Sequence, residues 1–139
     1  MTVSEILLLV LEIIGTISFS VSGAVVGIKA GLDIFGVVFV SAITAFGGGI
    51  LRDILIGRTP PAIFGNTYMV LLSVVSAFVV FIIIYRKRDK FFGMEERIEY
   101  INNFFDAIGL AAFSVIGTEV AFVSGFSDNT FLSVMLGML

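Results

Sequence analysis

The sequence contains neither cysteine nor histidine, and charged residues make up only 14% of its 139 positions. Disulfides, thiol nucleophiles and imidazole bases are therefore excluded, as are the side chains that zinc and other soft metals prefer. The 8 basic and 11 acidic residues give a net charge of −3 and no basic patch for nucleic acid. We expect no enzymatic activity, no metal site, no cofactor and no nucleic-acid partner.

Apolar residues are abundant instead. Hydrophobic side chains account for 58% of the chain, and the mean hydropathy is +1.14. A soluble core of this size cannot hide that much apolar surface, so the partner of the chain is expected to be a lipid bilayer. The apolar run over 6–14 follows acids rather than bases, and no small-residue cleavage site comes after it, which argues against a cleaved signal peptide.

Turn residues divide the chain into four apolar spans and the start of a fifth. The first has about 23 residues, enough to cross a hydrocarbon core of about 30 Å at 1.5 Å per residue. The prolines at 60 and 61 stop the second span, and a basic run stops the third. The prediction is an all-α polytopic membrane protein with spans at 6–28, 34–56, 68–85, 100–123 and 131–139.

Basic residues predict the orientation. With the N-terminus outside, the inside loops carry six of them, whereas the outside carries only Arg52 and Arg58. The positive-inside rule favours this arrangement in a multi-pass protein of the cell membrane. The six inside residues are Lys29, Arg86, Lys87, Arg88, Lys90 and Arg97.

An internal repeat relates the two halves. A shift of 94 residues places 14–45 on 108–139 with nine identities in thirty-two pairs, among them Phe19-Ser-Val21 with Phe113-Ser-Val115. Because each repeat has an odd number of spans, three, the second copy must enter the membrane from the opposite side, as in many transport proteins. We divide the chain into a first three-helix repeat with its inside loop at 1–97 and the start of an inverted second repeat at 98–139.

The same shift would place counterparts of Gly47, Gly48 and Gly49 at about 141–143. We therefore expect these 139 residues to be part of a protein of about 200 residues.

The glycine triplet is the first candidate site. Glycine costs roughly 1 kcal/mol in a helix interior relative to alanine, so three in a row need another reason. One interpretation is a broken helix that acts as a pore hinge, and the other is close helix packing. Ser41 and Thr44 precede the triplet on the same helix, where their hydroxyls could line a pore or bond back to the helix backbone.

Five ionisable residues within the spans are further candidates. Arg52 and Asp53 are about 100° apart on a helix, so each is expected to pair with a different group. Arg52, about 27 Å along its span, could snorkel to the surface or act in the pore or its gate. Glu12 and Asp106 are aligned acids that should face protein or water, or lie at the interface. Glu119 lies deep in the fourth span, and the repeat aligns it with an apolar residue. This suggests a cation-attracting or proton-coupling carboxylate.

Three of these features together resemble the prokaryotic branch of the trimeric intracellular cation (TRIC) channels, which overlaps a family labelled as glycine transporters. They are Gly-Gly-Gly-Ile-Leu-Arg-Asp at 47–53, Gly-Arg-Thr-Pro-Pro at 57–61 and the repeat that begins Ile-Gly-x-x-x-Phe-Ser-Val. The resemblance implies a seven-helix subunit of two inverted repeats plus a final helix. It also implies a homotrimer in which each subunit has its own pore, lined by glycine-kinked second and fifth helices.

The preferred function is therefore a channel subunit that conducts monovalent cations, K⁺ or Na⁺, at the broken second helix. The first alternative is a secondary transporter of a small amino acid such as glycine. A structural membrane module without conduction is the other alternative, although it explains neither the repeat nor the triplet.

Overall fold

The computed structural model describes residues 2–91 and 93–139, which form helices and no strand. Four helices are long and apolar enough to cross a membrane, which confirms the all-α polytopic prediction. In chain order the elements are α1 (Val3–Lys29), α2 (Ile34–Leu55), the 3₁₀ turn η1 (Ala62–Gly65), α3 (Thr67–Arg86), α4 (Arg88–Phe91), α5 (Glu95–Val123) and α6 (Thr130–Met138).

The helix boundaries follow from local chemistry. Gly31 and Gly125, which the 94-residue shift aligns, have φ of 74° and 83° just after α1 and α5, a conformation that favours glycine. The Asp33 carboxylate accepts a hydrogen bond from the Gly36 N–H at 2.8 Å and caps α2. The fourth span was predicted to begin at 100 but starts at Glu95, because acidic residues stabilise a first helical turn.

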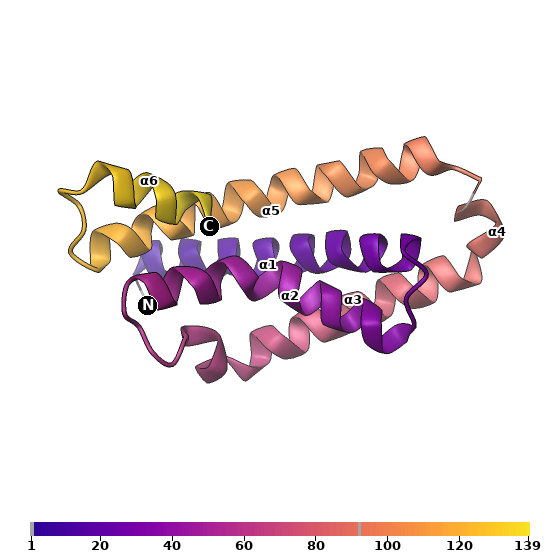
Figure 1. Ribbon diagram of the computed structural model, residues 1–139, viewed down its shortest axis with the longest axis horizontal. Helices are drawn as coiled ribbons and strands as arrows, with labels where there is room; N and C mark the ends of the chain where they lie inside the picture. Colours follow the sequence, from indigo (N-terminus) through magenta and orange to yellow (C-terminus); the bar gives the residue numbers. More distant parts are fainter. Residues whose placement is uncertain (1, 92) are drawn as a thin grey trace.

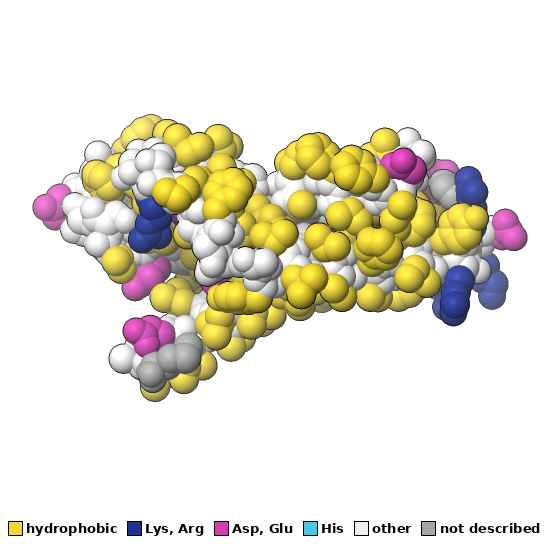
Figure 2. Space-filling view, turned by 90° about the horizontal axis from the view of Figure 1, so that it is seen from below, with side chains coloured by type: hydrophobic (Ala, Val, Ile, Leu, Met, Phe, Trp, Pro, Cys, Tyr) yellow, Lys and Arg dark blue, Asp and Glu magenta, His cyan; other side chains and the backbone are white. Residues whose placement is uncertain are grey.

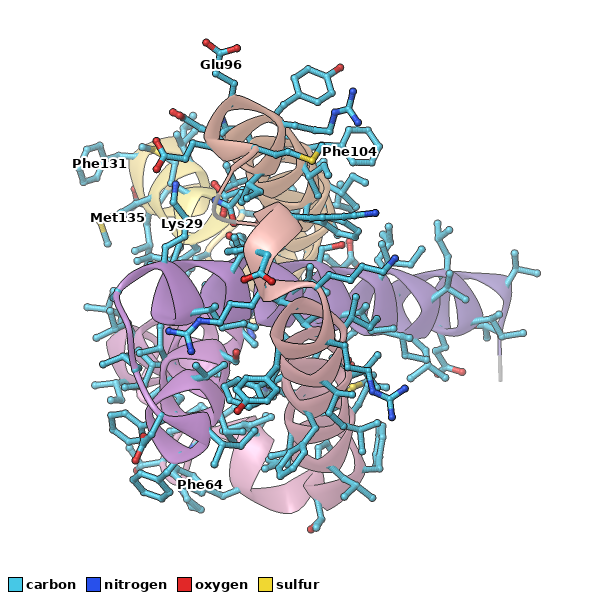
Figure 3. All side chains as sticks on the ribbon, turned by 90° about the vertical axis from the view of Figure 1, so that its right-hand side faces the viewer. Lys29, Phe64, Glu96, Phe104, Phe131 and Met135 are labelled. Atoms are coloured by element: carbon cyan, nitrogen blue, oxygen red, sulfur yellow. The ribbon has the colours of Figure 1, made fainter. Side chains whose placement is uncertain are left out.

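Helix α1 lies in the middle of the bundle. In Figure 3, which looks along the long axis, it crosses between α2 and α3 on one side and α5 and α6 on the other. It packs most extensively against α2 and α5, and then against α3. Small residues allow this close approach of three neighbours, since they let helix backbones come together in a membrane. The buried residues of α1 are Gly15, Thr16, Ser18, Ser20, Ser22, Gly23, Ala24, Val25 and Gly27.

The two repeats meet where α1 and α5 run antiparallel (Figure 1). Phe19 and Phe113 stack there, with ring centroids 5.5 Å apart and planes 10° apart. A Cβ atom on Gly15 would lie 2.7 Å from the Phe113 ring, and one on Gly109 would lie 2.9 Å from the Phe19 ring. Each aromatic ring therefore occupies the space that a glycine of the opposite repeat leaves empty.

The second pair of helices follows the same plan. Gly23 of α1 receives α2, since a Cβ atom there would lie 2.8 Å from Ser41 Cα. Its counterpart Gly117 of α5 receives α6, where a Cβ atom would collide with the Leu136 carbonyl and lie 3.0 Å from Gly137 Cα. This reciprocal packing confirms the inverted repeat, whereas its division into 1–97 and 98–139 stays a prediction.

The surface is suited to a bilayer. Figure 2 shows hydrophobic side chains across the middle of one face, with basic side chains gathered at the end where α3 meets α4. Large apolar residues such as Phe35, Leu71 and Phe104 are exposed by 57–76%. Phe64, Phe104 and Phe131 project away from the bundle in Figure 3. The chain is thus built as a multi-pass membrane protein.

Candidate ion-pathway site on the second helix

Helix α2 continues through the glycine triplet. The helix extends from Ile34 to Leu55, so no break interrupts it at Gly47, Gly48 and Gly49 in this conformation, and the pore hinge stays a prediction. Figure 1 shows the ribbon of α2 changing direction part-way along without an interruption. The neighbouring helices hold the segment helical despite its poor intrinsic propensity.

The three glycines have different surroundings. A Cβ atom on Gly48 would collide with the carbonyl oxygen of Leu139, so the end of the α6 segment lies directly on the α2 backbone here. A Cβ atom on Gly47 would meet only Ile43 at 3.9 Å, and one on Gly49 only the Arg52 guanidinium at 3.8 Å. Gly48 therefore has a packing role, while Gly47 and Gly49 leave space beside the helix.

Arg52 and Asp53 pair with each other. The Arg52 Nε and Nη2 atoms each lie 3.4 Å from Asp53 Oδ1. The expectation that each would pair with a different group is wrong. Although neighbouring residues point in different directions from a helix, the long arginine side chain bends far enough to reach the next residue. The side chain of Arg52 is only 12% exposed and that of Asp53 only 3%, which argues against a surface-anchoring arginine.

Asp53 also holds the loop that follows α2. Its Oδ2 accepts a hydrogen bond from the Ala62 N–H at 2.8 Å, and its backbone carbonyl accepts one from the Arg58 N–H at 2.8 Å. One buried carboxylate thus joins Arg52 to the start of η1. The two short bonds from Ala62 and Arg58 fix Asp53, which keeps its carboxylate beside the guanidinium at the end of α2.

Glu12 of α1 adds a third charge to this group. It is half-buried and interacts electrostatically with Arg52 across the contact between α1 and α2. We call Glu12, Arg52 and Asp53 the charge cluster. Two carboxylates and one guanidinium give it a formal charge of −1 when all three are ionised.

Ser41 and Thr44 face α1 at Gly23. The Thr44 hydroxyl donates to the Val40 carbonyl at 2.8 Å, which is the bond back to its own helix. The Ser41 hydroxyl is buried and has no partner among the described residues. Of the two predicted pore hydroxyls, only that of Ser41 is left unpaired.

The remaining predicted acids lie on α5. The Asp106 carboxylate faces α1 and accepts a long hydrogen bond, 3.5 Å, from the Ser22 hydroxyl. Glu119 is exposed on the outer side of α5, four residues before the helix ends at Val123. It therefore lies about 6 Å from the helix end. Its depth in a membrane stays a prediction.

A row of buried hydroxyls was missed at the sequence level. Thr16, Ser18, Ser20 and Ser22 alternate along α1 and are at most 4% exposed. The Ser20 hydroxyl donates to that of Ser73 on α3 at 2.8 Å. The alternation of hydroxyl residues in an apolar span was the available signal, because a polar group in such a span needs a protein partner. Within 2–91 and 93–139, no group of three acids could hold a metal ion.

Comparison with known proteins also indicates a multi-pass membrane protein. Residues 9–85, more than half of the chain, match the family model described as Glycine transporter. The chain belongs to this family. Its curated relatives include UPF0126 membrane proteins of Deinococcus radiodurans, 35% identical over 108 residues, and of Vibrio cholerae, 31% identical over 134 residues. These alignments cover 77% and 96% of the chain but only 46% and 52% of the relatives, so the chain spans about half their length.

Solved structures connect this glycine-transporter family to the TRIC channels. A prokaryotic TRIC channel crystallised in 0.5 M KCl is similar, with a TM-score of 0.83, 36% identity and coverage of 96% of this chain and 66% of that one. The TRIC trimeric intracellular cation channel orthologue from Rhodobacter sphaeroides has a TM-score of 0.76 and 30% identity, with 94% and 62% covered. The predicted TRIC resemblance and its overlap with the glycine-transporter family are confirmed.

Proposed function

We propose that the protein forms a channel for monovalent cations, K⁺ or Na⁺, with part of the pathway along α2 beside Gly47 and Gly49. The observation that carries this proposal is the similarity to a prokaryotic TRIC channel over 96% of the chain at a TM-score of 0.83. That similarity includes α2 with its glycine triplet, and it relates the helix to one in a cation channel.

The charge cluster supports a preference for cations. Arg52 alone would repel them, but Asp53 contacts its guanidinium and Glu12 adds a second negative charge nearby. When all three groups are ionised, the net charge of −1 near the end of α2 raises the local concentration of cations and lowers that of anions. In this proposal the positive charge of Arg52 acts as the gate of the ion pathway, and Asp53 holds the guanidinium away from that pathway.

The glycines supply space and flexibility in the same proposal. Gly47 and Gly49 leave the helix backbone uncovered, and the low helix propensity of the triplet allows α2 to bend when the channel opens. The Ser41 hydroxyl, buried without a described partner, is a candidate ion contact. We also propose an outside N-terminus and a homotrimer, the latter in line with the trimeric relatives.

Planar-bilayer recording of the purified protein tests this function. We expect unitary currents in KCl whose reversal potential, under a KCl gradient, moves towards the K⁺ equilibrium potential. Substitution of Asp53 by asparagine should reduce cation selectivity, whereas Asp89→Asn, in the short helix α4, should leave it unchanged. A reversal potential near that of Cl⁻ would contradict a cation pathway.

Transport of glycine is the second candidate, and it rests on the description of the family model. A transporter would take up radiolabelled glycine into proteoliposomes with saturation and dependence on an ion gradient. Uptake of that kind without unitary currents would favour the transporter. Currents without uptake would favour the channel.

A further inference from the structure

A groove opens between α3 and α5 at the end of the bundle where α4 connects them. Its floor is formed by Ile84 of α3 and Ile98 of α5, which are buried together against Val25 of α1. Ile83 and Ile101 line its sides and are 53% and 44% exposed. We call this cavity of about 280 Å³ the α3–α5 groove. Its other apolar lining residues are Phe91 and Met94.

Three basic residues line the same groove: Lys87, Lys90 and Arg97. All three are exposed, and within 2–91 and 93–139 none of them forms an ion pair. Lys87 follows Ile83 by four residues and Arg97 precedes Ile101 by four, a spacing of about 6 Å that keeps both residues on one face of a helix. On each side of the groove, a cation therefore lies one turn nearer the end of the bundle than an apolar residue.

The acidic residues of this segment lie outside the groove. Among the described residues, no carboxylate lines it. Glu95 and Glu96 border a separate hollow that shares Arg97 with the groove, and Glu96 projects from α5 away from α3 in Figure 3. Asp89 borders a third hollow together with the two lysines. The groove itself therefore combines positive charge with an apolar surface.

The groove lies at the level of a membrane interface. Its apolar sides belong to two helices that are long and apolar enough to cross a membrane, whereas its cations lie between the end of α3 and the first turn of α5. Tyr85 and Tyr100, exposed by 65% and 76%, come between the apolar and the basic positions along each helix. Tyrosine favours the boundary between lipid and water, which places the cations at the depth of lipid headgroups.

We propose that the α3–α5 groove binds one phospholipid with an anionic headgroup. The phosphate lies among Lys87, Lys90 and Arg97, and an acyl chain follows Ile83 and Ile101 towards the middle of the bilayer. Basic pockets between membrane helices recognise anionic headgroups in this way. A free anion would make no use of the apolar sides, and a neutral lipid would leave the three cations without a counter-charge. The bound lipid joins α3 of the first repeat to α5 of the second, and this role does not depend on ion conduction.

Tryptophan fluorescence can detect this lipid, because the chain has no tryptophan of its own. Ile83→Trp places a reporter in the groove. Ile82→Trp is the matched control, since Ile82 is the preceding residue of α3, is 47% exposed and does not line the groove. Each variant is reconstituted in vesicles of phosphatidylcholine and phosphatidylglycerol, with bromine atoms, which quench tryptophan on contact, on the acyl chains of one lipid or the other.

Quenching should show a preference for phosphatidylglycerol at the groove reporter alone. We expect an affinity about tenfold higher than for phosphatidylcholine at Ile83→Trp, and equal affinities at Ile82→Trp. Adding Lys87→Gln and Arg97→Gln should remove the preference. Arg58→Gln with Arg86→Gln, which removes the same formal charge outside the groove, should preserve it. Quenching by brominated phosphatidylcholine checks that each variant is inserted in the membrane.

Three results would overturn the proposal. The same preference at both reporters would show a diffuse attraction of the basic segment to an anionic surface; this comparison needs no change of a basic residue. A preference that survives Lys87→Gln with Arg97→Gln would separate it from the groove cations. Loss of the preference when glycerol phosphate is added on both sides of the membrane would show that the groove binds a free phosphate instead of a lipid.

Discussion

Phe19 and Phe113 stack at the crossing of α1 and α5, and each ring covers a glycine of the opposite repeat. Because α1 and α5 are antiparallel and related by the repeat, the same glycine–phenylalanine contact occurs twice. The two copies should respond to mutation in the same way. Gly15→Ala should destabilise the bundle, and this cost should disappear in a Phe113→Ala background, which lacks the ring that the new methyl group meets. In a Phe19→Ala background the cost of Gly15→Ala should remain. For Gly109→Ala the roles of the two phenylalanines should be exchanged.

Unfolding in mixed micelles, followed by far-ultraviolet circular dichroism, measures these effects. The Phe19–Phe113 pair itself should show a coupling of about 1 kcal/mol in a double-mutant cycle, as for other aromatic pairs. An equal cost of Gly15→Ala in both phenylalanine backgrounds would contradict the reciprocal geometry.

The glycine triplet should respond unevenly to alanine. Gly47→Ala improves helix propensity by about 1 kcal/mol and meets open space, so stability should hold or rise. Gly48→Ala places a methyl group against the Leu139 carbonyl, so α6 must move and stability should fall. Thermal unfolding of the two variants in one detergent compares neighbouring positions directly. Equal unfolding temperatures would remove the packing role of Gly48.

Asp53 should be more important for stability than an exposed acid. Asp53→Ala leaves the Arg52 guanidinium and the Ala62 N–H without their carboxylate, which should cost about 1–3 kcal/mol. Arg52→Gln in the same chain should recover part of the loss, because the uncompensated charge disappears. Asp128→Ala in the exposed turn after α5 is the control. Chemical unfolding that ranks the double variant below Asp53→Ala would contradict the pairing.

The hydrogen bond between Ser20 and Ser73 should contribute a measurable coupling between α1 and α3. Hydrogen bonds between membrane helices are worth about 0.6 kcal/mol on average, so a double-mutant cycle with alanine should give a value of that order. Ser76 lies on the same helix, but its hydroxyl bonds back to the Leu72 carbonyl. A cycle of Ser20 with Ser76 should therefore give no coupling.

Single cysteines can test the orientation, because the chain has none of its own. Thr59→Cys and Ser127→Cys should react in intact cells with a membrane-impermeant maleimide, since an outside N-terminus places both turns outside. Asp89→Cys should react only after permeabilisation. The opposite labelling pattern would reverse the topology.

Hydropathy and turn chemistry were sufficient to predict the four long helices, because apolar runs and residues such as Gly31 and Pro60 act locally. The inverted repeat was also visible, since Phe19 and Gly15 recur with their neighbours at one constant shift. The pairing of Arg52 with Asp53 was not, because ideal helix geometry ignores how far a long side chain can bend. The contact of Gly48 with Leu139 and the exposure of Glu119 depend on tertiary packing, which no local pattern specifies.

The basic segment between α3 and α5 connects the two inverted repeats. Its charges follow the last helix of the first repeat and precede the first helix of the second. With the proposed outside N-terminus, one set of cations retained in the cytoplasm during insertion would orient both halves at once. Moving these charges to the turn after α2 should invert the two repeats together rather than separately, so their antiparallel relationship survives an error in topology.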